Sequence, residues 1–589
     1  MKASRRLRRA LFAAASCAAS SAGAPLSAQD TTAAALADSA DARASRASCE
    51  GAVVAEVEIR RQPPRISRSA PRWSRPLLRV LFQQATTEPS AIRPFFLFEE
   101  RGRCEPFRLE ESERVLRAQP YLADAVVRAV PAAPGDSVRP GAVRVEVETV
   151  DEIPLVIGAR LRGGELAGLK YGSANAFGKG IYAAGEWRRG FAYRDGFAAR
   201  VVHYHVLGRP IRLSGEADRA PLGHDYSAAL ERPFYTAFQH VGWHAGARNV
   251  SEFVSFLRPE GPRLSLPYAR TRADAGGVIR LGPGGGILFA GPFVTYERAE
   301  PRGDPVVVTD TGLVDDPDPT LLGRYETFER TTLAGVLGAR LLSFLRVEGF
   351  DALAGPQDVA RGVQAAGAVG RSAGTGRDAT ALAADVYAGA GGTRSFLALR
   401  GQWEGRREPG QWANLVASGR VAWYWKPADR RTLILGAEYS GAWRQRRPFQ
   451  LALGDRGGGL RGYDESRVVG ARRAVLRAEH RWVVGGISDW LGLGVAGFAD
   501  AGKVWAGAVP YGQTTGLRAS VGAGLLAAVP RQSRRTVRLD VAVPVVKDPH
   551  AGYEVRVTTT RPIRGLWREP ADIQRVRAIL PPAGIFAWP

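Results

Sequence analysis

The chain has 589 residues, too many for one ordinary hydrophobic core, so we expect at least two folded units. Charged residues make up 24% of the chain and aromatic residues 9%, which excludes a disordered chain and a helical membrane protein. The formal net charge is +23, but the basic residues alternate with apolar ones and accompany no recognition motif, so we do not expect nucleic acid as a partner.

Residues 1–28 have the pattern of a secretory signal peptide. A basic region at residues 2–9 precedes an apolar segment at 10–19, and Ala24 and Ala28 are candidate cleavage positions. Beyond it, no apolar run reaches the roughly 18 residues that a spanning helix needs. An exported chain of this kind is expected to be soluble or a β-barrel. Residues 29–48 are rich in Ala, Ser, Asp and Arg, which predicts a flexible linker.

Residues 49–152 have the pattern of a small α+β domain. Alternation predicts strands, and helical spacing predicts helices, at these positions: strands 53–60, 123–130 and 142–150, and helices 73–85 and 109–119. Cys49 and Cys104 bracket the first half of this domain. In an oxidising compartment they can form a disulfide, and two separate buried thiols are the alternative.

Residues 153–562 consist of short alternating segments broken by Gly, Pro, Asp and Arg. Within 536–543, Val537 and Leu539 point to one face while Arg538 and Asp540 point to the other. Apolar-out and polar-in alternation is typical of a transmembrane antiparallel β-barrel. About 408 residues at roughly 25 per strand and loop predict about 16 strands. Residues 563–589 follow as a C-terminal tail to which the sequence assigns no role.

One loop and two strands of this region share a charge pattern. A glycine-rich run at 454–459 ends in a tetrapeptide: Leu460, Arg461, Gly462 and Tyr463. Alternation places three downstream residues on the lumenal face of one strand: Phe498, Asp500 and Gly502. Glu479 faces the lumen from the neighbouring strand. One loop arginine and two lumenal carboxylates predict a loop that is folded into the barrel by charge-assisted hydrogen bonds. An ordinary exposed loop with a chance Arg-Gly-Tyr is the alternative.

These motifs and their order resemble the C-terminal barrel of the BamA/TamA superfamily of outer-membrane assembly factors, also called the surface-antigen family. The segments 109–117, 121–125 and 147–151 likewise resemble its polypeptide-transport-associated (POTRA) domain. The resemblance implies sixteen strands and a lumenal contact from Arg461 to Asp500, with Glu479 beside it. It implies a structural or gating role for these residues. The chain departs from the family in having one POTRA-like unit and a tail of about 27 residues after the last expected strand.

The implied function is the assembly or translocation of proteins at the bacterial outer membrane, with the small domain in the periplasm. The small domain would capture unfolded outer-membrane or secreted polypeptides by pairing with an exposed edge strand, and the barrel would insert them or pass them through. A rigid spacer with a capped edge is the alternative for the small domain. Outer-membrane lipids are expected partners, and periplasmic or lipoprotein partners are left open. A two-partner-type exporter with a dedicated client and a plain pore are the alternative functions.

We do not expect an enzyme, a cofactor or a metal site. His203 and His205 share a strand face, but the sequence suggests no partner for them. Residues 224–227 have a triad-like composition but lie too close in sequence for one strand to bring their side chains together.

Overall fold

The computed structural model describes most of the chain after residue 43. The described ranges are 44–63, 86–132, 141–162, 165–191, 194–236, 238–282, 287–375, 378–454, 458–487, 490–560 and 569–579. The expected signal peptide, the expected linker up to residue 43 and the expected helix 73–85 lie outside these residues. Residues 44–49, at the end of the expected linker, are helical.

Contacts between backbone positions divide the chain into two units. The first contains residues 1–58, 98–108 and 128–146, and the second contains residues 59–97, 109–127 and 147–589. Each unit therefore takes part of the small domain expected at 49–152. In the part of the chain that the structure describes, no helix is both long enough and apolar enough to cross a membrane.

A three-stranded sheet lies in the N-terminal part of the chain. Its order is β1–β3–β2, with bounds β1 (Val53–Gln62), β2 (Leu122–Pro131) and β3 (Ala142–Asp151). The expected helix 109–119 is α5 (Pro106–Arg117), and two short helical turns precede it: α4 (Pro89–Ile92) and η1 (Arg93–Phe95). In β3 the side chains of Val143, Val145 and Val147 are buried, because alternation puts all three on one face.

The start of β1 has hydrogen-bonded neighbours on both sides. One is β3, and the other is the segment at residues 101–102. Val54 N donates to Gly102 O at 2.9 Å, and Arg101 N donates to Val54 O at 2.7 Å. A disulfide joins Cys49 to Cys104 beside this contact. The beginning of this edge is therefore not open to another strand, and capture of a client by strand pairing stays a proposal.

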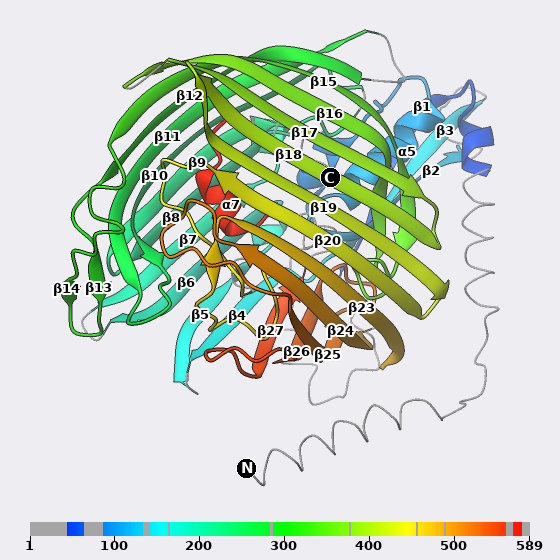
Figure 1. Ribbon diagram of the computed structural model, residues 1–589. Helices are drawn as coiled ribbons and strands as arrows, with labels where there is room; N and C mark the ends of the chain where they lie inside the picture. The colour runs from blue at the N-terminus through cyan, green and yellow to red at the C-terminus, as the bar shows by residue number, and fades with distance from the viewer. Residues whose placement is uncertain are drawn as a thin grey trace. The chain divides into compact units, whose positions relative to one another are not determined.

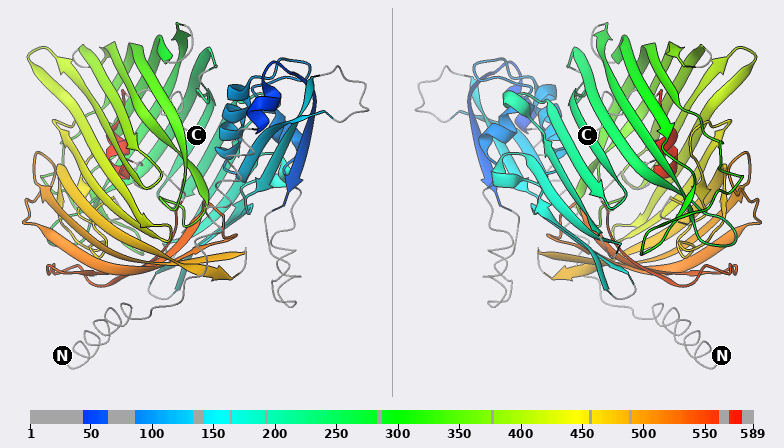
Figure 2. Two further views of the ribbon diagram at one scale, coloured as in Figure 1. Left: turned by 90° about the vertical axis from the view of Figure 1, so that its right-hand side faces the viewer. Right: turned by 90° about the vertical axis from the view of Figure 1, so that its left-hand side faces the viewer.

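The second unit contains a closed antiparallel barrel (Figures 1 and 2). Its first nine strands are β4 (Leu155–Arg162), β5 (Glu165–Ser173), β6 (Ile181–Phe191), β7 (Arg194–His203), β8 (Arg212–Ala220), β9 (Gly223–Arg232), β10 (Val241–Phe256), β11 (Leu264–Leu281) and β12 (Ile287–Pro301). The next six are β15 (Phe328–Glu348), β16 (Pro356–Gly374), β17 (Ala379–Gly391), β18 (Ser395–Glu408), β19 (Gln411–Ala428) and β20 (Arg431–Trp443). The last five are β23 (Arg472–Ile487), β24 (Leu491–Trp505), β25 (Arg518–Ala528), β26 (Thr536–Pro544) and β27 (Glu554–Thr560).

The class of fold is the expected one, but the barrel has more strands than expected. The closed order names 22 strands, of which β13 (Val306–Val308) and β14 (Leu313–Asp315) form a side hairpin, so 22 − 2 = 20 described strands make the wall. β12 pairs directly with β15 past that hairpin. The expected number of about 16 was too low because many turns are short: only residues 409–410 separate β18 from β19.

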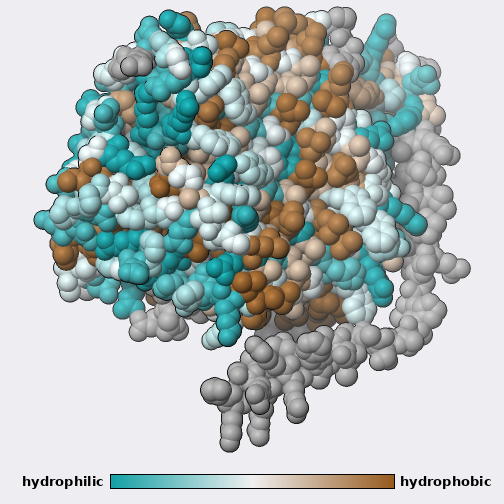
Figure 3. Space-filling view, viewed as in Figure 1, coloured by the Kyte–Doolittle hydropathy of each residue, from teal (hydrophilic) through white to brown (hydrophobic). Residues whose placement is uncertain are grey.

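Apolar side chains cover the outside of the wall. On β26, Val537 and Leu539 are 44% and 39% exposed, whereas Arg538 and Asp540 are 5% and 3% exposed. Figure 3 shows hydrophobic residues gathered over the strands that face the viewer. Outward-facing residues of this kind include Leu333, Leu337, Leu341, Val363, Val369, Leu397 and Leu399. The alternation that the sequence predicts is thus the alternation between the outer face and the lumen.

The barrel closes between its first and last strands. β27 follows β26 in the closed order and lies next to β4. These two strands have 7 and 8 residues, against 21 residues in β15 on the wall. The seam is therefore built from two of the shorter wall strands.

Candidate functional site in the barrel lumen

The described residues of the loop at 444–471, between β20 and β23, fold back against the inner wall. A two-residue strand pair, β21 (Leu451–Ala452) with β22 (Val469–Gly470), holds its two arms together. Leu460 N donates to Leu453 O at 2.7 Å. A Cβ atom on Gly459 would lie 1.9 Å from Leu453 O, so this turn accepts only glycine without moving the backbone.

Arg461 lies at the tip of this turn and binds two carboxylates of the wall. Its Nε donates to Asp500 Oδ2 at 2.7 Å and its Nη2 donates to Asp500 Oδ1 at 2.7 Å, which is a bidentate pair. Its Nη1 donates to Glu479 Oε2 at 3.3 Å. The guanidinium carbon lies 3.5 Å from the centre of the Phe498 ring, so the cation also stacks on an aromatic face.

Other charged side chains extend this contact into a network. Arg538 donates to both oxygens of Glu479, at 2.8 and 3.0 Å, and to Asp540 Oδ1 at 3.1 Å. Arg481 also donates to Glu479. We call the six side chains the lumenal arginine cluster: Arg461, Arg481, Arg538, Glu479, Asp500 and Asp540. Three cations and three anions balance one another, which lowers the penalty for removing these charges from water.

The rest of the tetrapeptide is fixed by the same wall. Gly462 N donates to Glu554 Oε2 at 2.6 Å. The Tyr463 hydroxyl lies 2.7 Å from Val546 O and 3.0 Å from Ala519 O. Leu460 packs beside Gly502, where a Cβ atom would lie 3.1 Å from Leu460 Cδ2.

The structure thus brings together every residue of the expected lumenal contact: Leu460, Arg461, Gly462, Tyr463, Glu479, Phe498, Asp500 and Gly502. The sequence also placed Arg538 and Asp540 in the lumen, but did not connect them with Arg461. The missing information was strand order, because β26 reaches the cluster across β25 and β24. Within the described residues, no three His, Cys, Asp or Glu side chains are placed to hold a metal ion.

A second charged group surrounds His244 on the inner wall. Its Nε2 lies 2.9 Å from Asp274 Oδ2, and its Nδ1 lies 3.4 Å from Glu231 Oε2. These side chains come from β9, β10 and β11, which are neighbours in the wall. The partners of His244 lie on other strands, so strand order is needed to connect them with it. His203 and His205, by contrast, contact each other through their rings, whose centres are 4.9 Å apart.

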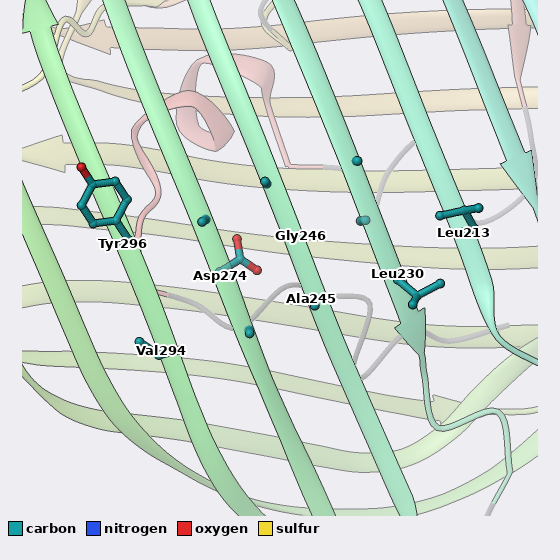
Figure 4. A pocket seen from close by; sticks show the side chains of 12 residues that line it. Leu213, Leu230, Ala245, Gly246, Asp274, Val294 and Tyr296 are labelled. Carbon is teal, nitrogen blue, oxygen red and sulfur yellow. The ribbon is translucent and has the colours of Figure 1, made fainter.

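The outer face carries a shallow hollow over β8 to β12 (Figure 4). Small side chains form its floor, among them Ala228, Ala245, Ala247, Ala273 and Ala275. Leu213, Leu230, Val294 and Tyr296 stand around them. Its lining is almost wholly apolar and lacks the converging polar groups of a specific ligand site.

The sequence matches no protein-family model and no curated protein. Among solved structures, the chain is similar to BamA from Haemophilus ducreyi lacking POTRA domains 1-3, with 11% identity, a TM-score of 0.37, and coverage of 86% of this chain and 84% of that one. CdiB from Escherichia coli gives 11% identity, a TM-score of 0.43, and coverage of 86% and 76%. The alcaligin receptor FauA from Bordetella pertussis gives 12% identity, a TM-score of 0.29, and coverage of 70% and 66%. The closed barrel itself is shown by the chain's own strand pairing.

Proposed function

We propose that this protein is an outer-membrane barrel of the BamA/TamA type that helps unfolded polypeptides insert into, or cross, the outer membrane. The observation that carries the proposal is the seating of Arg461 on Asp500 and Glu479 inside a closed barrel. Holding a loop in the lumen through buried charges costs desolvation free energy. A plain pore does not need such a loop. The wall has 20 described strands, more than the sixteen that the resemblance implies.

The proposed mechanism is passive. The small N-terminal sheet captures an extended client segment, and the barrel receives it at the lumen or at the seam between β4 and β27. The short strands at the seam present fewer main-chain hydrogen bonds to break than the long strands of the opposite wall. The lumenal arginine cluster keeps loop 444–471 in place on β23, β24 and β26 while the seam moves.

The test is reconstitution in liposomes with an urea-denatured outer-membrane barrel as the client. Wild-type protein should accelerate the appearance of folded, protease-resistant client relative to empty liposomes, and Arg461→Ala should reduce this rate. Client trapped inside the vesicles would indicate export rather than insertion. Equal client folding with and without the protein, together with no client inside the vesicles, would show that the proposal is wrong.

A further inference from the structure

The described part of the C-terminal tail lies inside the barrel. Its helix α7 (Ala571–Val576) is drawn in red within the ring of strands in Figures 1 and 2. Ile573 and Val576 are 0% and 1% exposed. They pack against residues of two wall strands and of loop 444–471: Val416, Ala442, Phe449 and Leu451.

Two main-chain N–H groups after α7 are bound by one carboxylate of the wall. Glu404, on β18, accepts from Ala578 N at 2.7 Å through Oε1 and from Ile579 N at 3.2 Å through Oε2. The carboxylate is 1% exposed. A buried anion with its two oxygens on consecutive amides is a strong arrangement, because a charged acceptor roughly doubles the strength of each hydrogen bond.

Main-chain carbonyls of the same segment are bound by arginines. Arg447, in loop 444–471, donates to Val576 O at 2.6 Å. Arg270, on β11, donates to Arg577 O at 3.0 Å. Both arginines also pair with Glu297, whose single carboxylate offsets one of their two positive charges. Four main-chain groups of residues 576–579 are therefore satisfied by charged side chains from outside the tail.

The end of the described segment packs in an apolar cluster. Ala578 and Ile579 are 3% and 4% exposed. They lie in a cluster of wall residues: Phe234, Val278, Ile287, Phe289, Phe293, Val336, Ala368, Ala381 and Ala383. This cluster accommodates apolar side chains, whereas the hydrogen bonds beside it are made to main-chain atoms.

We propose that the wall around Glu404, Arg270 and Arg447 is a binding site for an extended polypeptide segment, and that residues 569–579 are its resident occupant. The site binds the main chain of residues 576–579 and buries Ala578 and Ile579 beside it. It also contacts two polar side chains of the segment, since Ser418 donates to Glu569 Oε1 at 2.6 Å and Arg577 donates to Ser418 Oγ at 3.2 Å. The assignment of the displacing ligand rests on the proposed function: a client segment in transit would compete with the tail. Loop 444–471 supplies both Arg447 and Arg461, so the tail site and the lumenal arginine cluster share one element.

The first experiment measures single-channel conductance of full-length protein in planar bilayers. Ile573→Asp places a carboxylate in the apolar seat of α7, and Ala571→Asp is the matched control, because Ala571 is on the same helix and exposed. We expect at least a doubling of unitary conductance for Ile573→Asp and no change for Ala571→Asp. Ile573→Ala, which only shortens the side chain, serves if the Asp variant fails to fold. Equal conductance of all variants would show that the tail does not block the lumen.

The second experiment adds a fluorescent peptide with the sequence of residues 569–579 to the full-length variants in detergent. It should bind Ile573→Asp about a hundredfold more tightly than wild type, where the attached tail occupies the site. Peptide methylated on the amide nitrogens of Ala578 and Ile579 should bind about tenfold more weakly, because Glu404 loses both donors.

Absence of peptide binding to Ile573→Asp would overturn the binding site, and unchanged affinity after N-methylation would overturn main-chain recognition. Neither assay contains a client protein. If both succeed while liposome insertion and export fail, the peptide site stands and the proposed function does not.

Discussion

At the scale of single residues, Arg461 is held in the lumen by two carboxylates and one aromatic ring. It is 7% exposed and forms a bidentate pair with Asp500, a bond to Glu479 and a stack on Phe498. Lysine cannot reproduce this arrangement, because an ammonium group has no planar fork to match a carboxylate and stacks less well.

Arg461→Ala should destabilise the folded barrel by about 3–5 kcal/mol, since it leaves the buried Asp500 without its bidentate partner. Arg461→Lys should recover less than half of the loss. Arg467→Ala is the control, because the guanidinium of this neighbour on the same loop donates to Gly261 O and not to the lumenal arginine cluster. Thermal unfolding followed by the heat-dependent shift in gel mobility measures the effect, and an Arg461→Ala protein as stable as the control would contradict it.

Asp151, at the end of β3, should make stability depend on pH. Burial raises the pKa of Asp151 to about 6, although Thr87 donates to it from N at 2.8 Å and from Oγ1 at 2.6 Å. The folded pKa lies above the unfolded value of about 3.9, so the folded state binds the proton more tightly. Its stabilising contribution is full below about pH 4 and is lost as the pH rises through about 6.

Asp151→Asn imitates the protonated acid and should remove this dependence. Between about pH 4 and pH 7, wild type should lose about 2–3 kcal/mol relative to the variant. The measurement is the difference in apparent melting temperature between the two proteins at each pH. Parallel pH profiles of the two proteins would show that Asp151 keeps an ordinary pKa.

At the scale of elements, loop 444–471 depends on glycines that let its backbone approach the wall and itself. Gly459 is the tightest point, and Gly462 has a φ of 82°, in the left-handed region. Arg477 adds hydrogen bonds from Nη2 to the carbonyls of Gly458 and Gly459, each at 2.8 Å. The loop is therefore seated through its backbone as well as through Arg461.

Gly459→Ala should displace the turn that carries Arg461 and destabilise the loop by about 1–3 kcal/mol, because its Cβ would overlap Leu453 O. Gly497→Ala is the control, since a Cβ atom at that outward position on β24 has no neighbour within 4 Å. Limited proteolysis at 444–471 measures the displacement. Similar cleavage rates in both variants would contradict a backbone-limited turn.

At the scale of the whole molecule, the two units are stabilised in different ways. The described wall strands satisfy their main chain because the sheet closes on itself, so that each has a neighbour on both sides. In the first unit, the start of β1 lies at the edge of a small sheet. The disulfide between Cys49 and Cys104 spans 55 residues beside it. Cross-linking of that length stabilises by about 4 kcal/mol in the chain-entropy account.

Reduction, or the double change Cys49→Ser and Cys104→Ser, should therefore act on the first unit and spare the barrel. We expect proteolysis within residues 44–58 and 98–108 of the first unit to become at least tenfold faster, with unchanged heat-dependent mobility of the barrel. A matched sample treated with a non-reducing analogue is the control. Loss of the barrel's folded mobility on reduction would contradict separate stabilisation of the two units.

The sequence alone was sufficient for local structure and for the faces of strands. Alternation on β24 and β26 identified which side chains enter the lumen, because the two-residue repeat depends only on backbone geometry. The glycines around Arg461 indicated a tight loop for the same local reason. The helix α5 and the strands β1 to β3 were also predicted closely, since their patterns are short-range.

Tertiary structure decided everything that depends on which strands are neighbours. The wall has 20 described strands, whereas about 16 were expected, because many of the turns are short. Strand order brought Arg538 and Asp540 to Arg461 and put Asp274 and Glu231 beside His244, contacts between residues far apart in sequence. The position of the tail also follows only from the closed lumen. A sequence repeat specifies the direction of a side chain, whereas its partner across a barrel is set by closure of the whole sheet.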